Sequence, residues 1–361
     1  MNTTPINTTP INTTLMNTTL MNTTPMNTIP MSTMPINTTP MKTIPMSTMP
    51  MNAMPSTKSH IRLVNLLILL ALMAVLSPAF AQSTAPIKHT VLSNSHPMAL
   101  WEKSIAEPRG HIILHHGRTW SSLPDFDLQV PGEQLSLMDG FNKLGYSVWA
   151  LDARGYGQTP RDASGWNNPD KAAADLAAVL SWLQSRTGQK IHLWGWSYGS
   201  MVAQLTAQRY PQHIQSITLY GYPLRSLDPV PADSTGGKPP AAINTAKNAA
   251  SDFIVEGAIS QKAIDEYVRH ALAADPLRAD WNNLQQWNQL DASQVTVPVL
   301  LLQAEFDPLA KTPVYAQVFT ELPNANKQWV VLAGGDHAAL LETPRMRLIT
   351  ASINFMEWLK Q

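Results

Sequence analysis

The chain has 361 residues, with 25 basic and 25 acidic side chains and therefore a formal net charge of zero. This balance gives no reason to expect nucleic acid or an anionic surface as a partner. There are no cysteines, which excludes disulfides, thiolate metal sites, a cysteine nucleophile and a lipid-modified N-terminal cysteine.

Residues 1–55 are eleven five-residue repeats related to Met-Asn-Thr-Thr-Pro, in which Lys42 is the only charged residue. They have no helical or strand periodicity and their prolines remove backbone donors, so we predict a disordered tract. One interpretation is a surface-exposed interaction tail. The other, which we favour, is a repeat expansion or a start codon assigned too early, with Met51 or Met54 as the natural start.

Residues 56–81 have the three parts of a secretory signal peptide. Lys58 and Arg62 supply positive charge, residues 63–76 are almost wholly apolar, and an Ala-Phe-Ala cleavage site ends at Ala81. We predict cleavage after Ala81 and a secreted or periplasmic protein; an uncleaved N-terminal membrane anchor is the alternative. The apolar run falls short of the roughly 20 residues that a membrane span needs, which favours a signal peptide over a membrane span. We expect no stable membrane insertion of the mature domain.

The mature chain, residues 82–361, alternates strand-like apolar runs with helical periodicity, which predicts a mostly parallel sheet covered by helices on both faces. Strands are expected at 111–117, 146–152, 191–196, 217–220, 297–302 and 329–332. Helices are expected over 135–144 before Gly145, from Pro169 to Gly188, over 201–209, and after Thr343-Pro344.

This alternation breaks at about 223–291, where we predict a helical cap inserted between two strands. The clearest helix has its apolar residues at i, i+3, i+4, i+7 and i+8 from Ile264 to Leu272. The spacing of the apolar residues from Trp281 to Leu290 predicts that the helical pattern continues there.

The segment Gly195-Trp196-Ser197-Tyr198-Gly199 has the G-x-S-x-G pattern of a nucleophile elbow, between a predicted strand and a predicted helix. Such a turn holds the serine in a strained conformation, and only small residues fit two positions before and after it. The alternative is a glycine-rich turn with a buried serine.

A serine hydroxyl needs a base, and the base needs an acid to orient it. With this elbow the chain order is serine, acid, histidine. Of the histidines after Ser197, His337 is favoured over His213 and His270 because it directly follows the last strand. His115 and His116 are expected to shape the first loop.

Asp307, just past the strand at 297–302, is the expected acid. Glu305 is its near rival and Asp228 its distant one. Asp336, next to His337, is expected to be a solvated loop carboxylate that points elsewhere.

An oxyanion hole needs two backbone N–H groups. We assign them to Tyr198, after the nucleophile, and to Arg118, in the loop after the first buried strand. The Arg118 guanidinium is expected to pair with Asp125 or Asp127 rather than with substrate. Five tryptophans are candidates to line an acyl-binding pocket, with core and cap packing as the alternative: Trp120, Trp166, Trp196, Trp281 and Trp287.

Over about residues 87–360 the chain resembles α/β-hydrolase family serine hydrolases of the esterase, lipase and serine-aminopeptidase-like branch. The resemblance is carried by His116-Gly117, Asp152-Ala153-Arg154-Gly155-Tyr156-Gly157, the Gly195–Gly199 elbow, Asp307 and Gly335-Asp336-His337. It implies an α/β-hydrolase fold with an eight-stranded type of sheet, a Ser197–Asp307–His337 triad, no cofactor or metal, and hydrolysis of an acyl bond in a small molecule. A serine nucleophile speaks against the dehalogenase and epoxide-hydrolase branches, which use aspartate.

We therefore expect an exported serine hydrolase that acts on carboxylic esters. An amidase, peptidase or thioesterase would use the same three residues. A non-catalytic binding protein with this fold, and an interaction protein that works through the repeats, are the alternatives from other classes.

Overall fold

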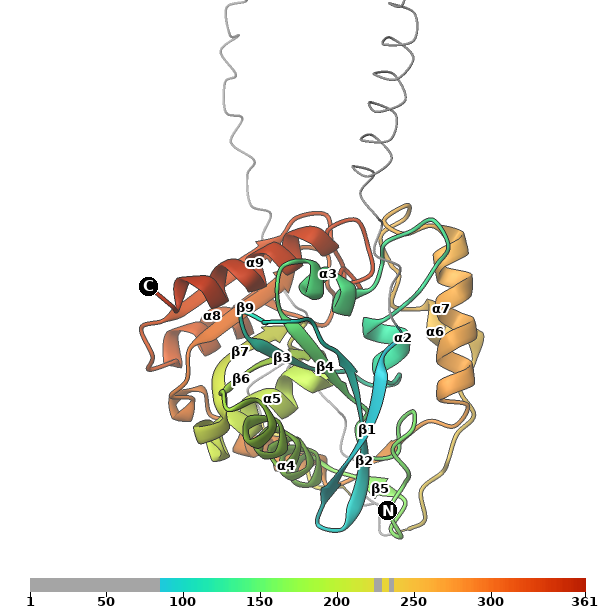
Figure 1. Ribbon diagram of the computed structural model, residues 1–361. Helices are drawn as coiled ribbons and strands as arrows, with labels where there is room; N and C mark the ends of the chain where they lie inside the picture. The colour runs from blue at the N-terminus through green and yellow to red at the C-terminus, as the bar shows by residue number, and fades with distance from the viewer. Residues whose placement is uncertain (1–84, 224–228, 234–236) are drawn as a thin grey trace, which may run out of the picture. The chain divides into compact units, whose positions relative to one another are not determined.

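The computed structural model describes residues 85–223, 229–233 and 237–361 (Figure 1). The predicted repeat tract and signal peptide, residues 1–81, lie outside the described residues. Across the described ranges, no helix combines the length and apolar character that a membrane crossing requires.

One eight-stranded sheet organises the domain, in the order β1-β2-β4-β3-β6-β7-β9-β10. The strands from β4 to β10 pair in parallel, whereas β1 and β2 are antiparallel to each other and β2 is antiparallel to β4. The predicted α/β fold with a mostly parallel sheet is confirmed. The strands are β1 (Ile87–Ser93), β2 (His96–Lys103), β3 (His111–His115), β4 (Ser147–Leu151), β6 (Ile191–Trp196), β7 (Ile214–Tyr220), β9 (Val299–Ala304) and β10 (Lys327–Leu332).

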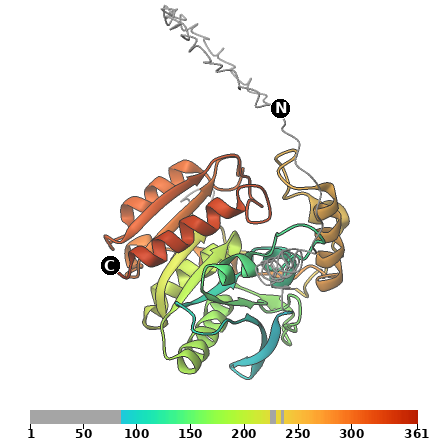
Figure 2. The same cartoon turned by 45° about the horizontal axis from the view of Figure 1, so that its top comes forward.

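Helices cover both faces of this sheet, and the alternation of side chains along each strand builds a core on each face. In β3, for example, Ile113 belongs to one buried cluster while Ile112 and Leu114 belong to the other. The first cluster includes residues of α4, α5 and α8, and the second includes residues of α2, α3 and α9. Figure 2 shows helices on both sides of the sheet. The helices are α2 (Ser122–Phe126), α3 (Leu137–Lys143), α4 (Pro169–Thr187), α5 (Tyr198–Arg209), α8 (Thr312–Glu321) and α9 (Arg345–Trp358).

Helix α4 begins and ends where its sequence predicts. Pro169 is its first residue, and the side chain of Asn168 caps it by accepting from the backbone N–H of Lys171. Gly188 follows with a φ of 72°, the left-handed conformation that glycine adopts without steric cost. Long α4 packs beside α5 and so supports the turn that carries Ser197.

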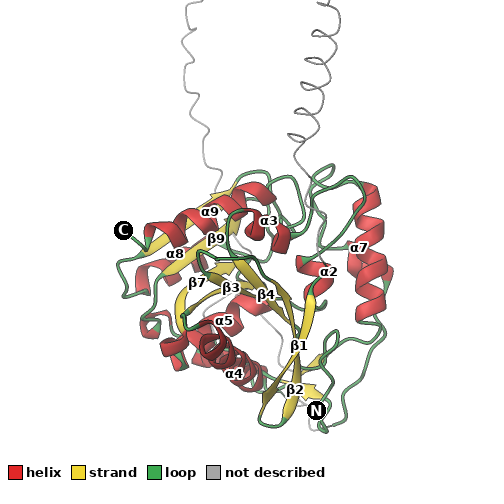
Figure 3. Cartoon of the chain, viewed as in Figure 1, coloured by secondary structure: helices red, strands yellow, loops and turns green. Residues whose placement is uncertain are grey.

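The segment between β7 and β9 forms helices outside the main sheet, drawn on the right in Figure 1. Its α7 contacts α2, and the Tyr267 hydroxyl donates to Asp125 at 2.9 Å. The predicted continuation of the helical pattern to Leu290 is confirmed only in part: Asn283, with a φ of 50°, interrupts it, and a 3-10 helix follows over Leu284–Gln289. The elements are α6 (Ala246–Ala250), α7 (Gln261–Ala274), the short β8 (Asp280–Trp281) paired with β5 (Trp166–Asn167), and 3-10 helices at Leu284–Gln289 and Ala292–Gln294. Figure 3 shows α7 as the long helix of this segment.

Candidate active site

Ser197 occupies the tight turn between β6 and α5. Its φ of 55° and ψ of −125° are strained for a residue with a side chain. The backbone N–H of Ser197 donates to the carbonyl of Tyr220 at 2.9 Å, and the N–H of Ser200 donates to the Ser197 carbonyl at 2.9 Å. These bonds hold the serine at the carboxyl end of the central strands, where ligands bind in parallel α/β sheets.

The two glycines of the elbow are required by close backbone contacts. A Cβ at Gly195 would lie 2.3 Å from the carbonyl oxygen of Gly199, and a Cβ at Gly199 would lie 2.2 Å from that of His115. Both distances are far inside van der Waals contact. Helix α5 can therefore start directly after Ser197 only because these positions have no side chain.

Asp307 and His337 meet at the same end of the sheet. The Nδ1 atom of His337 lies 2.8 Å from Asp307 Oδ2, and both side chains are buried. The other carboxylate oxygen of Asp307 accepts from the backbone N–H groups of Leu309 and Ala310. With both oxygens engaged, the carboxylate orients the imidazole and leaves Nε2 as its free nitrogen.

His337 is also fixed to the elbow itself. The indole N–H of Trp196, the residue before Ser197, donates to the His337 carbonyl at 2.9 Å, and the two ring centroids are 5.3 Å apart. Gly221, just past β7, has a φ of 57°, and a Cβ there would lie 3.1 Å from His337 Cε1. The missing side chain at Gly221 therefore leaves room for the imidazole, a role that the sequence analysis did not assign.

Carboxylates around His337 set its charge. Burial acts to lower the pKa of His337, but the hydrogen bond and charge of Asp307, together with the charges of Asp252 and Asp336, outweigh it and raise the pKa above its ordinary value. Asp252 was not anticipated, because no motif marks it and only folding of the cap brings it near His337. Its own pKa is raised, by burial first and then by Asp336 and Asp307, despite an opposing effect of His337.

The rival acids have other partners. The carboxylate of Glu305 is exposed and accepts from the backbone N–H of Gly334 at 2.9 Å. Asp228 lies outside the described residues. Asp336 does point away from the His337 ring, but the prediction that it is solvated is wrong. It is fully buried, and it accepts from the N–H groups of Ile254 and Val255 in the cap and of Ala338.

The first loop runs directly against the nucleophile. A Cβ at Gly117 would lie 2.8 Å from the Cβ of Ser197, so the backbone that continues to Arg118 starts beside the serine. The N–H of Tyr198 belongs to the first turn of α5, where backbone donors lack partners within the helix. The N–H groups of Arg118 and Tyr198 are the two that the sequence predicts for an oxyanion hole.

The two histidines before this loop are structural, as expected. His116 Nε2 accepts from the backbone N–H of Ala153 at 3.0 Å, and His116 Nδ1 lies 2.8 Å from the Gly117 carbonyl. Burial lowers the pKa of His115 to about 4 and that of His116 to about 3, so both are neutral at pH 7.

The predicted ion pair of Arg118 is wrong. Asp127 instead pairs with Lys103 at 2.5 Å, and Asp125 accepts from the hydroxyl of Tyr267. The Arg118 guanidinium lies over the ring of Tyr198, with its central carbon 5.6 Å from the ring centroid. Proximity in sequence misleads here, because α2 turns its acids toward β2 and the cap.

The five tryptophans separate into different environments. Trp281 and Trp287 pack edge-on against Tyr198, with ring centroids at 5.4 and 5.7 Å, and Trp196 contacts His337. Trp120 is fully buried in the second core cluster. Trp166 lies in β5 and donates to the carbonyl of Gly237. Three of the five therefore lie against elbow residues or His337.

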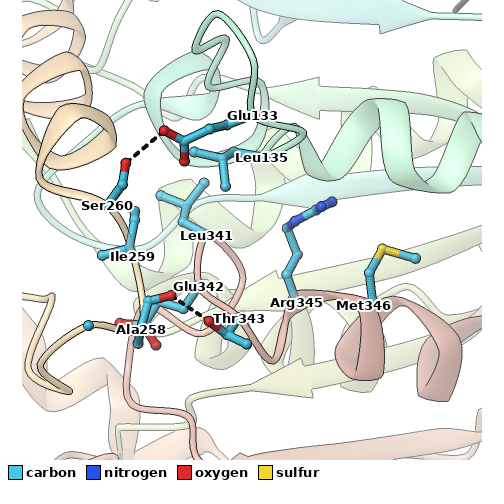
Figure 4. A pocket seen from close by; sticks show the side chains of 11 residues that line it. Glu133, Leu135, Ala258, Ile259, Ser260, Leu341, Glu342, Thr343, Arg345 and Met346 are labelled. Atoms are coloured by element: carbon cyan, nitrogen blue, oxygen red, sulfur yellow. Dashed lines mark hydrogen bonds between the residues drawn. The ribbon is translucent and has the colours of Figure 1, made fainter.

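A separate cavity of about 320 Å³ is lined by residues of the 133–135, 257–260 and 341–346 segments (Figure 4). None of the three triad candidates lines it. The Glu342 side chain on its wall is 3 % exposed and lies close to Asp336. Burial, and then the nearby charge of Asp336, raise the pKa of Glu342 to about 8.

Glu342→Gln should make stability less dependent on pH. In the wild type the folded state keeps a proton that the unfolded state loses above an ordinary pKa near 4.5, so stability falls as pH rises from about 4.5 to about 8. We expect the variant to match the wild type near pH 5 and to exceed it by a few kcal/mol near pH 8. Thermal melts at the two pH values measure this. An equal difference between the two proteins at both values would contradict it.

An eight-stranded mostly parallel sheet with a serine on a strained turn after a central strand defines an α/β-hydrolase fold. The model of the family described as serine aminopeptidase S33 matches residues 106–344. The chain belongs to this family, and the suspected membership of the α/β-hydrolases is confirmed. This family has the α/β-hydrolase fold.

Two curated relatives are similar in sequence. The biotin biosynthesis bifunctional protein BioHC of Cellvibrio japonicus is 27% identical over 270 residues, which are 69% of this chain and 48% of that protein. The serine hydrolase BPHL of Homo sapiens is 30% identical over 149 residues, 40% of this chain and 46% of that protein. The match thus spans about half the length of these relatives.

Solved structures share the fold at low identity. A membrane phospholipase A described as a bacterial virulence factor matches with a TM-score of 0.56 and 18% identity, over 85% of this chain and 100% of that one. A thermophilic esterase from Thermogutta terrifontis matches with a TM-score of 0.54 and 18% identity, over 77% and 100%. At this identity the likeness shows the fold alone.

Proposed function

We propose that this protein is an exported serine hydrolase that cleaves carboxylic esters of small molecules through Ser197, His337 and Asp307. The observation that carries the proposal is the 2.8 Å contact between His337 Nδ1 and Asp307, on a histidine whose carbonyl binds the residue before Ser197. A buried acid on Nδ1 leaves Nε2 to act as a base, which is what a serine nucleophile requires.

The proposed reaction has two steps. Ser197 Oγ attacks the acyl carbonyl while His337 Nε2 takes its proton, and the N–H groups of Tyr198 and Arg118 stabilise the oxyanion. The intermediate collapses as the alcohol leaves with the proton from His337. A water molecule, deprotonated by His337, then hydrolyses the acyl-enzyme and restores Ser197.

A screen of matched substrates tests the bond type. We expect turnover of short-chain p-nitrophenyl esters and covalent labelling of Ser197 by a fluorophosphonate. Thioesters and aminoacyl anilides are the other two substrate classes in the screen. They are included because a solved thioesterase domain has a similar fold and because the family is described as serine aminopeptidase. Preference for either class would reassign the bond. Absence of both labelling and turnover, beside a reactive control hydrolase, would favour a binding protein.

The proposal of export rests on the signal-peptide features of residues 56–81. If they direct export, the protein recovered outside the cytoplasm should begin at Gln82, which mass spectrometry of its N-terminal peptide measures. An N-terminus within the repeats would support the membrane-anchored or surface-tail alternatives instead.

A further inference from the structure

Two arginines at the first loop have no acidic partner among the described residues. Arg118 follows the loop glycine that touches Ser197, and Arg278 comes from the cap, two residues before the short strand β8. The Nε atom of each is buried and makes no hydrogen bond in the part of the chain that the structure describes. They come from distant parts of the sequence, but Arg278 donates to Thr119, the residue that follows Arg118 in the first loop.

The position of Arg118 is set by aromatic rings. Its guanidinium lies over Tyr198, the residue after the nucleophile, and Tyr198 in turn packs against Trp281 and Trp287. It also lies close enough to Tyr156 to act against burial, which raises the pKa of that phenol. Stacking on rings orients the guanidinium without using its N–H donors.

Arg278 approaches the same place from the cap. Its Nη2 donates to the hydroxyl of Thr119, the residue after Arg118, at 3.2 Å. Its backbone is held at both ends, because its N–H donates to Ala242 and its carbonyl accepts from Arg161. The side chain is therefore held between the cap and the first loop, and is not a loose surface group.

Other half-buried arginines near the site are paired. Arg154 binds Asp175 at 2.8 Å, and Arg161 binds Asp280 at 3.1 Å. Asp275, three residues before Arg278, is occupied by the backbone N–H groups of Ser121 and Gly157. Partial removal of a cation from water is costly unless an anion compensates it.

We propose that Arg118 and Arg278 bind a carboxylate of the substrate, so that the preferred esters carry a negative charge. This rests on the proposed function and adds its substrate class. Guanidinium groups form paired, directional hydrogen bonds with carboxylates. The Arg118 guanidinium over Tyr198 and the Arg278 guanidinium at Thr119 approach the first loop from two sides, and together they match an ester with a free carboxylate on its acyl or its alcohol part.

Matched esters test the charge preference. On the acyl side the pair is mono-p-nitrophenyl adipate and p-nitrophenyl methyl adipate; on the alcohol side it is the butyrate ester of 4-hydroxybenzoate and of its methyl ester. We expect kcat/KM to favour the charged member of at least one pair about tenfold or more. No preference in either pair would overturn the proposal, as would a preference for a cationic aminoacyl ester over its neutral analogue.

Substitution of each arginine tests whether it causes the preference for charged esters. Arg118→Met and Arg278→Met should each bring the charged-to-neutral ratio toward one. The matched control Arg347→Met, at an exposed arginine that donates to the Ala333 carbonyl, should keep the ratio. An unchanged ratio in both variants would refute the assignment. Thermal melts verify folding, and Arg278→Lys, which keeps the charge without the planar fork, should retain part of the ratio.

A binding measurement separates this proposal from the proposed function. In the Ser197→Ala background, calorimetry should detect binding of monomethyl adipate that weakens about tenfold when Arg278→Met is added. Such binding without any wild-type turnover would remove the esterase proposal and keep the anion site. Turnover of neutral esters without such binding would keep the esterase proposal and remove the anion site.

Discussion

Ser197→Ala should lower kcat/KM for p-nitrophenyl esters by about 10³-fold or more and abolish fluorophosphonate labelling. The reason is chemical: with the hydroxyl gone, His337 has no nucleophile to activate, and only the oxyanion donors and substrate binding remain. Stability should change little, because alanine keeps the Cβ and both backbone hydrogen bonds of the turn. Steady-state kinetics and intact-protein mass spectrometry measure the two effects.

Ser185→Ala is the matched control for this variant. Ser185 is exposed on α4, and its hydroxyl donates only to the Trp182 carbonyl of the same helix. We expect wild-type rates and labelling from it. If Ser197→Ala retained labelling, another residue would be the nucleophile and the proposed triad would be wrong.

Local patterns predicted much of the fold. The ends of α4 follow from Pro169 and Gly188, and the buried parallel strands appear as short apolar runs. The hairpin of β1 and β2 was missed, because β1 lies at the sheet edge and most of its side chains are not buried. The β5–β8 pair was missed too, since two-residue strands from distant segments leave no periodic signal.

The candidate site likewise contains some residues that local sequence patterns predict and others that they do not. Asp307 and His337 follow strand ends, and parallel strands bring those ends to one edge, so position along the chain was enough to predict that the two side chains lie together. The roles of Asp252 and Asp336 depend on how the cap folds back onto the sheet, which no local pattern encodes. The error for Arg118 has this origin as well, because its neighbours in sequence are not its neighbours in space.

Asp307→Asn should reduce kcat by about 10³- to 10⁴-fold. Asparagine would fill nearly the same space, and the N–H groups of Leu309 and Ala310 could still find an oxygen acceptor. What is lost is the negative charge that stabilises the protonated His337 and selects its tautomer. Glu305→Gln is the matched control, because that exposed carboxylate binds Gly334 and should leave kcat within about threefold.

The pH profile makes the Asp307→Asn test specific. The active form has neutral His337, so wild-type activity should fall as pH drops through the raised pKa of this histidine. Without the charge of Asp307, the pKa of His337 should fall relative to the wild type, moving the acid limb of the residual kcat/KM to lower pH. The same linkage applies to stability: the contribution of the Asp307–His337 pair is full below the unfolded histidine pKa of about 6.5 and is lost as pH rises through the folded one. An acid limb that stays in place in Asp307→Asn but shifts in Glu305→Gln would make Glu305 the acid.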